Sequence, residues 1–539
     1  MSFYDDASLV FLPSGGAGKD TKAYSIKPTN GDGDFTFSRG SNLTATRVDS
    51  NGLIEKGREN LLLQSNSFNT TWSLSSTSVT SGQSGYDGSS DAWLLNSTTT
   101  GFPRIAQNVT SSGVATYSIY AKAAADSFIQ LKTFGADSEV WFNLSSGTIV
   151  SSSGSQYITS NIQSVGNGWY RCSVTFNGSL TSLRVYPASA FGVYSTSGNG
   201  VYIQDAQLEQ GLVATEYIES GATKGKAGIL EHSPRFDYSN GASCPSLILE
   251  GSRTNEIGYS EYFEGWTPQG SPTITSNYGT SPEGLQNSSR LRYTTDSDYI
   301  ETSVTNTSGV FSIYAKGTGN LILTDSGANA SSTTALTSSY QRIELYFSTN
   351  TTTLQIKTDS SGLDAEVYAA QFENATYPTS YIPNHSGGSV TRDEDVCTNS
   401  TGGVSQTEGT IFIDYKDSPN KDVLFACSTS SGLITNNIRL SYNQLYIRNS
   451  TGNLVVASVT LPDEGKLAIK YDTNGVKIFS NGNSTPIYTN STRISFDGSV
   501  DFVRVGSRVN NAGIEQFNVN QFLIFTTALS DNNCITLTS

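Results

Sequence analysis

Histidine, methionine and cysteine are scarce in this chain, with two, one and five residues among 539. The cysteines are odd in number and far apart, with no histidine beside them: they are Cys172, Cys244, Cys397, Cys427 and Cys534. That spacing argues against a disulfide framework or a zinc site, and it predicts buried free thiols. His232 and His385 belong to no nucleophile motif, and the chain has no Gly-x-Ser-x-Gly elbow. The sequence therefore predicts no catalytic residues, no metal and no cofactor, and it identifies no ligand-binding residue.

Charged residues and long apolar runs are also scarce. Only 15% of the residues are charged, and acidic ones outnumber basic ones, which gives a formal net charge of −15. An acidic surface repels phosphate backbones, so we expect no nucleic-acid partner. No run of about 18 apolar residues exists, so we expect no membrane span. Residues 1–6 lack the basic flank and apolar stretch of a secretory signal, so we expect synthesis in a cytoplasm and release, if any, by lysis or within a particle.

Small polar residues, 51 glycines and 11% aromatic residues make up much of the chain. This composition is typical of many short strands joined by many turns, with aromatic side chains to fill the cores. Apolar and polar residues alternate with a period of two, and long tracts of helix-forming residues are absent. The sequence predicts an all-β protein, and its length favours three or four domains.

The middle of the chain contains an internal repeat of four blocks in the same order. Residues 118–122 and 312–316 both read Ser-Ile-Tyr-Ala-Lys. The other matched blocks are residues 60–72 with 255–266, 169–174 with 340–345, and 201–218 with 367–382. Because each block alternates like a strand, the repeat predicts two β-sandwiches. The second copy is shorter, which fits the loss of a loop or hairpin.

Each repeat begins with a phenylalanine and a tryptophan, Phe68 and Trp72 in the first copy and Phe263 and Trp266 in the second. One interpretation makes the tryptophans platforms on which sugars stack. The other places them in the core, because large aromatic side chains are mostly buried and both lie beside a phenylalanine. We favour the core.

Short motifs flank the two copies in a fixed order. They are Phe37 to Ser41 (Phe-Ser-Arg-Gly-Ser), Ala45 to Val48, Gly52 to Glu55, Pro234 to Tyr238, Cys244 to Glu250 and Arg253 to Asn255. This pattern resembles the head-spike and head-fibre proteins of tailed bacteriophages, including those of crAss-like gut phages, over roughly the first 390 residues. In many of those relatives Gly-Leu-Ile-Glu leads directly to Pro-Arg-x-Asp-Tyr, whereas here a whole sandwich separates them. Gly228 to Glu231 resembles Gly52 to Glu55, which indicates that duplication placed the sandwich between these two motifs.

The resemblance implies a virion structural protein made in the bacterial cytoplasm, a head fibre or spike with carbohydrate-binding-like sandwiches. Its partners would be the capsid or other virion proteins, host-surface or mucin glycans, and two further copies in a homotrimer. We expect these units: residues 1–58, a virion-docking base; 59–224, the first sandwich; 225–255, a connecting base motif; 256–392, the second sandwich; 393–539, a C-terminal module. The resemblance supplies no sugar-contacting residue.

The C-terminal module resembles laminin-G and concanavalin-type sandwiches. Residues 466–472 and 475–482 form a predicted hairpin, and the chain closes with Ala-Leu-Ser-Asp at 528–531. Relatives of this kind often bind glycans, sometimes with calcium. The acidic candidates here, Asp472, Asp497 and Asp501, are scattered, so we interpret them as solvated turn residues.

Two further acidic or glycine-rich features need an interpretation. Asp32-Gly33-Asp34 is typical of a turn, and the Gly-rich loop at residues 13–19 lacks the ending and spacing of a phosphate-binding loop. A glycosidase needs only two carboxylates across a cleft, and 47 acidic residues leave that class open. We expect a non-enzymatic, glycan-binding display protein. The alternatives are a glycan-cleaving fibre enzyme and a purely architectural decoration protein.

Overall fold

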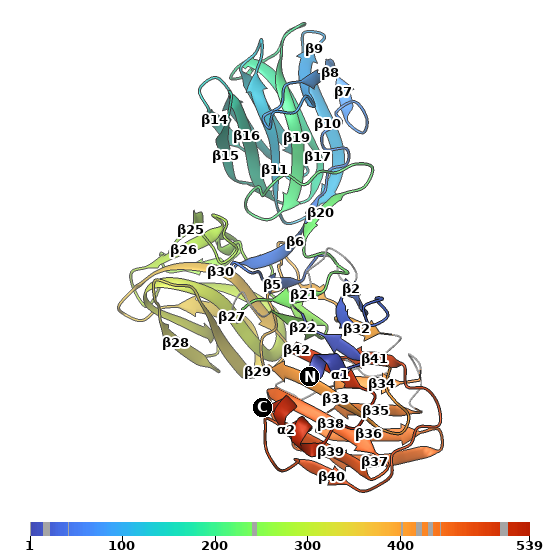
Figure 1. Cartoon of the computed structure of the whole chain (residues 1–539). Coiled ribbons are helices and arrows are strands. Elements are labelled where there is room, and N and C mark those ends of the chain that lie inside the picture. The colour runs from blue at the N-terminus through green and yellow to red at the C-terminus, as the bar shows by residue number, and fades with distance from the viewer. Residues whose placement is uncertain are drawn as a thin grey trace.

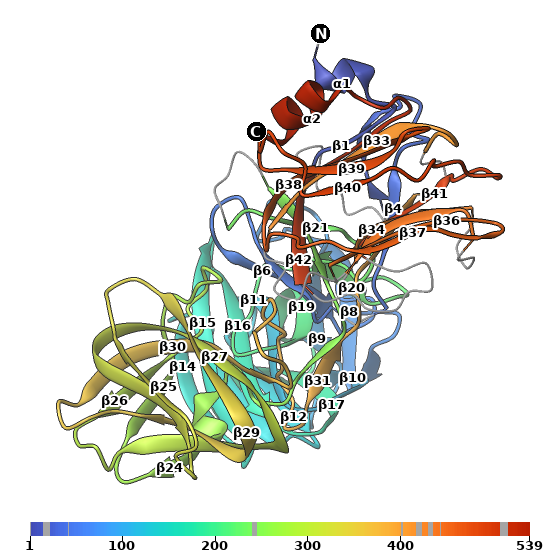
Figure 2. The ribbon, with the colours of Figure 1, turned by 90° about the horizontal axis from the view of Figure 1, so that it is seen from below.

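Three β-sandwiches make up the computed structural model (Figures 1 and 2). The described residues are 2–13, 22–40, 43–239, 245–399, 403–416, 423–429, 435–441, 443–506 and 516–539. Within these ranges the helical elements are α1 (Phe3–Asp6), α2 (Asp531–Thr538) and a single 3₁₀ turn, η1 (Phe263–Gly265). None of the helices in the described part of the chain is long and apolar enough to cross a membrane. The prediction of an all-β chain of tandem sandwiches is confirmed.

The first sandwich consists of two antiparallel sheets around one core. One sheet has the order β14-β13-β12-β17-β10-β7, with β18 added on β17, and the other has the order β15-β16-β11-β19-β9-β8. The strands are β7 (Ser73–Ser75), β8 (Thr77–Gln83), β9 (Ala92–Ser97), β10 (Arg104–Ser111), β11 (Val114–Ala123), β12 (Phe128–Phe134), β13 (Ser138–Asn143), β14 (Thr148–Ser153), β15 (Tyr157–Gly166), β16 (Trp169–Asn177), β17 (Leu180–Ala190), β18 (Val193–Tyr194) and β19 (Gly200–Gln210). Alternation places Tyr117 and Ile119 of β11 in the core and Tyr120 on the outer face.

The second sandwich repeats this arrangement with longer, bent strands. Its sheet has the order β24-β27-β30-β26-β25, with β28 and β29 paired to β27. The strands are β24 (Thr267–Gln269), β25 (Thr273–Gly279), β26 (Ser288–Tyr293), β27 (Tyr299–Asp325), β28 (Ser331–Ala335), β29 (Gln341–Lys357) and β30 (Leu363–Glu373). Both ends of β27 pair with β29, so the two strands run from one layer into the other. β28 pairs with β27 as β13 pairs with β12, whereas β14 and β15 have no counterpart among these strands, as the shorter second copy predicted.

Matched residues of the two copies form the same buried hydrogen bonds. Glu209 on β19 accepts from the backbone N–H of Thr215 at 2.8 Å and from its hydroxyl at 2.6 Å. Glu373 on β30 accepts from Thr379 in the same way, at 2.7 and 2.6 Å. Further matched pairs with equivalent bonds are Asn60 and Asn255, Ser65 and Ser260, and Arg171 and Arg342. The prediction of a repeated sandwich is therefore confirmed, and the shared residues hold the scaffold.

The third sandwich is assembled from three stretches that are distant in sequence. One sheet has the order β21-β22-β42-β33-β38-β39-β40, with β1 paired to β42 and β3 to β1; the other has the order β2-β4-β32-β41-β34-β35-β36-β37. The first sheet contains β1 (Leu9–Phe11), β3 (Ser25–Lys27), β21 (Arg235–Asp237), β22 (Ser246–Glu250), β33 (Gly409–Lys416), β38 (Gly465–Asp472), β39 (Gly475–Ser480), β40 (Tyr488–Asn490) and β42 (Gln516–Phe525). The second contains β2 (Lys22–Ala23), β4 (Phe35–Ser38), β32 (Val396–Asn399), β34 (Val423–Ser428), β35 (Asn437–Ser441), β36 (Gln444–Asn449), β37 (Gly452–Ser458) and β41 (Phe502–Val505).

This arrangement differs from the units expected at residues 1–58, 225–255 and 393–539. Phe37 of the expected base and Leu247 of the expected connector lie in one core with Ile411 and Phe522. The apolar side chains of β1 and β4 are buried against the chain's own sheets, so they are not free to dock on another protein, whereas Ile26 of β3 is 49% exposed. The alternation of short strands shows which side faces a core, but it does not show with which distant strand each one pairs.

Five charged side chains, all 0–1% exposed, lie together where the third sandwich meets the second; we call them the buried charge cluster: Arg39, Arg235, Glu250, Arg392 and Asp395. Arg39 contacts Asp395 at 3.0 Å, and Glu250 contacts Arg235 at 2.8 Å and Arg392 at 2.9 Å. Arg235 also pairs with Asp395. Burial alone would raise the pKa of Glu250, but the charges of Arg392 and Arg235 hold that pKa well below its usual range.

A short three-stranded sheet joins the three sandwiches. It has the order β20-β6-β5, with β5 at Thr46–Val48, β6 at Ile54–Asn60 and β20 at Gly225–Gly228. Lys56 on β6 contacts Glu261 and Glu283 of the second sandwich, both at 2.8 Å. Arg58 on the same strand pairs with Glu283 and, at 3.4 Å, with Glu209 of the first sandwich. A two-stranded pair, β23 (Arg253–Asn255) and β31 (Val390–Arg392), closes the base of the second sandwich.

The shared sheets predict that the third sandwich needs its N-terminal strands. A fragment of residues 393–539 should be unfolded, whereas a fragment of residues 59–224, which holds both sheets of the first sandwich, should fold. The dispersion of amide signals in NMR spectra shows whether each fragment is folded. In the whole chain, Phe37→Ala should lower the free energy of unfolding by about 3–5 kcal/mol. A well-dispersed spectrum from residues 393–539 would contradict this assembly.

The buried charge cluster predicts a large effect of removing one partner. Arg235→Met leaves Glu250 and Asp395 with fewer counter-charges out of water, so it should lower the free energy of unfolding by about 3–5 kcal/mol. The control is Lys224→Ala, which removes an exposed contact with Glu59. This substitution should change the free energy of unfolding by about 0–1 kcal/mol. Denaturant unfolding followed by fluorescence measures the difference, and equal effects of the two substitutions would contradict the prediction.

Candidate functional site

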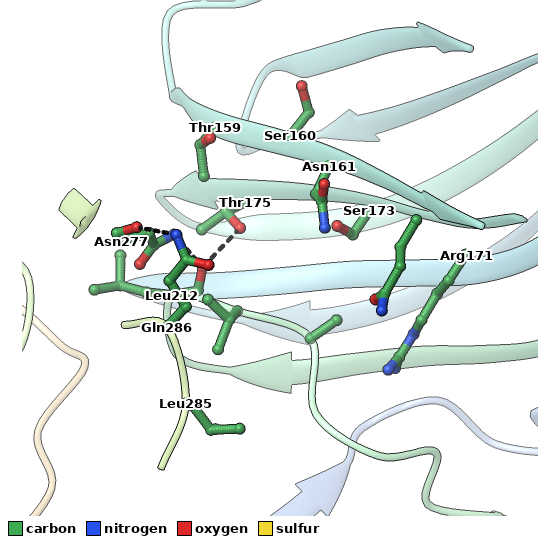
Figure 3. A pocket seen from close by; sticks show the side chains of 13 residues that line it. Thr159, Ser160, Asn161, Arg171, Ser173, Thr175, Leu212, Asn277, Leu285 and Gln286 are labelled. Atoms are coloured by element: carbon green, nitrogen blue, oxygen red, sulfur yellow. Dashed lines mark hydrogen bonds between the residues drawn. The ribbon is translucent and has the colours of Figure 1, made fainter. Parts of the chain in front are cut away.

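A polar groove of about 450 Å³ lies on the outer face of the first sandwich, at its border with the second (Figure 3). We call it the interface groove. Its lining consists of Thr159, Ser160, Asn161, Gln163, Arg171, Ser173, Thr175, Leu212, Val213, Ala214, Asn277, Leu285 and Gln286. This volume falls in the range typical of small-molecule sites.

Two neighbouring strands form the floor of the groove. Asn161 of β15 lies directly opposite Ser173 of β16, and Gln163 lies opposite Arg171. The intervening Cys172 and Val174 of β16 point into the core and are fully buried. Because side chains alternate between the faces of a strand, the same pattern that builds the core places hydroxyl and amide groups in a row outside it.

The wall opposite the floor comes from both sandwiches. Asn277 of β25 donates from Nδ2 to the backbone oxygen of Leu212 at 3.0 Å, and Thr175 donates from Oγ1 to the same oxygen at 3.2 Å. Gln286 Nε2 donates to the backbone oxygen of Asn277 at 3.1 Å. The buried side-chain oxygen Oδ1 of Asn277 has no hydrogen-bond partner within the described structure. The border of the two sandwiches therefore contains one unsatisfied buried acceptor.

Arg171 is the one charged residue of the lining, and most of its guanidinium is already engaged. It donates from NH2 to Ser118 Oγ at 3.0 Å and from NH1 to the backbone oxygen of Thr215. Arg342 makes the same two contacts in the second sandwich, so this role belongs to the repeated scaffold. None of the described lining residues is Asp, Glu, His or Cys. The groove offers hydroxyl and amide groups for binding but no acid–base pair.

The tryptophans considered in the sequence are core residues. Trp72 is 4% exposed and Trp266 is 3% exposed, and each packs against its phenylalanine at 5.2 and 5.3 Å between ring centroids. The prediction that they fill the core is confirmed. Four of the cysteines are buried free thiols as predicted, namely Cys172, Cys397, Cys427 and Cys534. Cys244 lies outside the described residues.

The acidic candidates of the sequence do not come together. Asp472 accepts from the backbone N–H of Asn474 within a turn, and Asp497 accepts from the backbone N–H of Ser450. Asp34 likewise accepts from the backbone N–H of Ser25. Within the described residues no group of three His, Cys, Asp or Glu side chains could hold a metal ion. The Gly-rich loop at residues 13–19 lies outside the described residues after Pro13.

The two histidines have different surroundings. His232 is exposed. His385 lies near Glu261, Lys56 and Arg58, and burial together with the two cations lowers its pKa to about 4, although Glu261 opposes the shift. His385 is therefore neutral at neutral pH. The structure brings neither histidine into the interface groove.

Comparison with known proteins gives distant likenesses. No family model and no curated protein matches the chain. The carbohydrate-binding module CBM40 of a Ruminococcus gnavus IT-sialidase, bound to α2,6-sialyllactose, is 18% identical with a TM-score of 0.21, over 25% of this chain and 85% of its own. The tandem CBM51 modules of a family 98 glycoside hydrolase from Streptococcus pneumoniae are 11% identical with a TM-score of 0.18, over 68% and 99%. TM-scores this low support no inference about ligand or family, so the assignment below rests on the groove itself.

Beyond Arg171 the outer face of the same sheet becomes aromatic. Tyr86 stacks on Tyr120 with 3.8 Å between ring centroids, and its hydroxyl donates to Asp205 at 3.0 Å. Burial raises the pKa of Asp205 to about 7; the bond from Tyr86 opposes this shift, whereas the charges of Asp91 and Asp87 add to it. The second sandwich has Ala369 at the matching position, and both residues have a positive φ, 51° and 56°.

The raised pKa of Asp205 predicts a pH-dependent stability of the first sandwich. Between its ordinary pKa of 3.8 and about 7, the folded chain holds a proton that the unfolded chain has released, so stability falls as pH rises through this window. Asp205→Asn removes this loss, so its melting temperature should rise relative to the unsubstituted protein from about pH 4 to about pH 7. Calorimetry at a series of pH values measures the difference, and a constant difference would contradict the assignment.

Proposed function

We propose that this protein is a non-enzymatic display protein of a tailed bacteriophage that binds glycans in the interface groove. The observation that carries the proposal is the composition of the groove: hydroxyl and amide side chains on a flat strand floor, with one cation and no carboxylate. Sugars present many hydroxyl groups that both donate and accept hydrogen bonds. Asn161, Gln163 and Asn277 can do both as well, because a side-chain amide has a donor and an acceptor.

The arrangement of the sandwiches supports display. Figure 1 shows α1 and α2 together on the third sandwich, while the first sandwich lies at the opposite end of the molecule. Phe3 of α1 and Ile535 of α2 pack on the same apolar cluster of that sandwich. We assign the third sandwich to the particle side and the first to the host side. The capsid partner and the homotrimer stay predictions of the resemblance.

The motifs behind the resemblance support a shared scaffold. Arg39, Arg235 and Glu250, which belong to three of those motifs, all lie in the buried charge cluster. None of them lines the groove. A family that shares this cluster would share the way its sandwiches are joined, while the binding faces could differ from one member to another.

Binding to an array of mucin O-glycans and capsular polysaccharides tests the proposal. We expect retention of at least one glycan class by the whole chain, and a loss of affinity of about tenfold or more for Asn161→Ala with Gln163→Ala, because each lost hydrogen bond costs about 1 kcal/mol. The matched control is Glu344→Ala, since Glu344 occupies the position of Ser173 in the second sandwich and is exposed.

Three outcomes would overturn parts of this proposal. Absence of binding to any glycan would leave the architectural alternative. Equal loss in the Glu344→Ala control would remove the groove as the site. New reducing ends released from a bound glycan, and abolished by replacing one carboxylate, would establish the glycan-cleaving alternative.

A further inference from the structure

Five aromatic rings lie on the opposite side of the first sandwich, on the outer face of the β14-β13-β12-β17-β10-β7 sheet. We call this set the aromatic face: Phe102, Trp141, Tyr186, Phe191 and Tyr194. Ring centroids are 5.5 Å apart for Trp141 and Phe191, 5.4 Å for Trp141 and Tyr194, 5.4 Å for Tyr186 and Tyr194, and 5.2 Å for Phe102 and Tyr194. The rings therefore form one connected cluster, in which Tyr194 contacts three of the other four.

The aromatic face has buried rings at its base and exposed rings at its rim. Trp141 and Tyr186 are each 5% exposed, whereas Phe191 is 53% and Phe102 is 65% exposed. The core of the sandwich lies on the other side of the sheet and is filled by neighbours such as Val140 and Phe142. Two large apolar rings are thus exposed to solvent on a well-packed sheet, and neither ring belongs to the core of the sandwich.

Hydrogen-bonding groups lie beside the rings. Gln130 is opposite both Tyr186 and Trp141 in the sheet register, and its Oε1 accepts from the hydroxyl of Tyr194 at 3.0 Å. Next to it Lys132 forms an ion pair with Glu139 at 2.6 Å, and Arg184 donates from NH1 to the Tyr186 hydroxyl at 3.3 Å. The face combines apolar rings with amide, hydroxyl and basic side chains.

The second copy of the repeat does not form this face. The segment matching the Phe102 loop is residues 294–298, Thr-Thr-Asp-Ser-Asp, and the segment matching the Phe191 loop is residues 358–362, Thr-Asp-Ser-Ser-Gly. Neither contains an aromatic residue, and β28, which pairs with β27 as the Trp141 strand β13 pairs with β12, contains none either. The scaffold therefore folds without these rings, and they are specific to the first sandwich.

We infer that the aromatic face is a second glycan site, at which the C–H faces of neutral hexopyranose rings stack on Phe102 and Phe191. This inference rests on the proposed function and extends it to the opposite sheet. A stable contact with a second copy buries about 800 Å² per partner, over 20–30 residues. Only Phe102, Phe191 and Val193 of this region are large apolar residues more than half exposed, which suits one or two sugar units. Two sites on opposite faces would increase binding to a dense glycan layer through avidity.

Saturation-transfer difference NMR tests the inference, with O-glycans released from gastric mucin as the probe and irradiation at aromatic proton frequencies. The whole chain should transfer saturation to sugar ring protons. Added to the groove variant Asn161→Ala with Gln163→Ala, the pair Phe102→Ala and Phe191→Ala should reduce that transfer about tenfold, because it removes the stacking surface. Tyr346→Ala, an exposed aromatic residue of the second sandwich, and the groove variant Asn161→Ala with Gln163→Ala should retain it.

The outcomes separate this inference from the proposed function. Absence of transfer in the groove variant, while the array shows binding to the whole chain, would overturn the second site and leave the groove. Absence of binding in both experiments would overturn the proposed function itself. Concentration-dependent self-association in light scattering, lost in the Phe102→Ala with Phe191→Ala variant, would show that a second copy covers the face and would overturn the inference. Unchanged melting temperatures of the variants exclude unfolding as the cause.

Discussion

The position of the sandwiches depends on charges that are held out of water. Arg39, Arg235, Glu250, Arg392 and Asp395 come from four separate stretches of the chain, yet they meet in one buried cluster. Each carboxylate contacts two arginines, and backbone groups complete the cluster: Arg392 donates to the oxygen of Gly251 at 2.9 Å, and Glu250 N–H donates to Asp395 at 3.0 Å. Taking such charges out of water is costly unless every partner is present, so the cluster forms only when all four stretches are in place.

That constraint explains why the third sandwich contains strands from both ends and the middle of the chain. Arg39 follows β4, Arg235 begins β21 and Glu250 ends β22, so pairing the charges fixes the ends of these strands. On the other side, Ser380 donates to Glu250 from both its N–H and its hydroxyl, at 2.7 and 2.6 Å, which attaches the second sandwich. Lys56 and Arg58 on β6 repeat the principle between the first and second sandwiches. The sandwiches are thereby held together by specific ion pairs and hydrogen bonds rather than by flexible linkers alone.

The sequence predicted the parts of the fold that depend on local pattern. The alternation of apolar residues gave the strands, and the repeated blocks gave two sandwiches with Trp72 and Trp266 in their cores. It did not predict the third sandwich correctly, because the pairing of β1 with β42 joins residues more than 500 positions apart. The interface groove could not be predicted from the sequence either. Asn161 and Gln163 are ordinary polar residues of an outward strand face, and only the approach of Asn277 from the second sandwich makes them a site.

Duplication makes the division between scaffold and binding surface visible within one chain. Residues that match between the copies form the same hydrogen bonds: Glu209 and Glu373 are buried, and Arg171 and Arg342 are partly buried. Surfaces that differ lie outside the cores: Ser173 of the groove floor corresponds to the exposed Glu344, and the Phe102 loop corresponds to a polar turn. Since the two copies keep the same fold with different faces, the faces are not needed for folding. The first sandwich therefore combines a scaffold that it shares with the second and two outer faces, one at the polar groove and one with aromatic rings, that lie outside that shared scaffold.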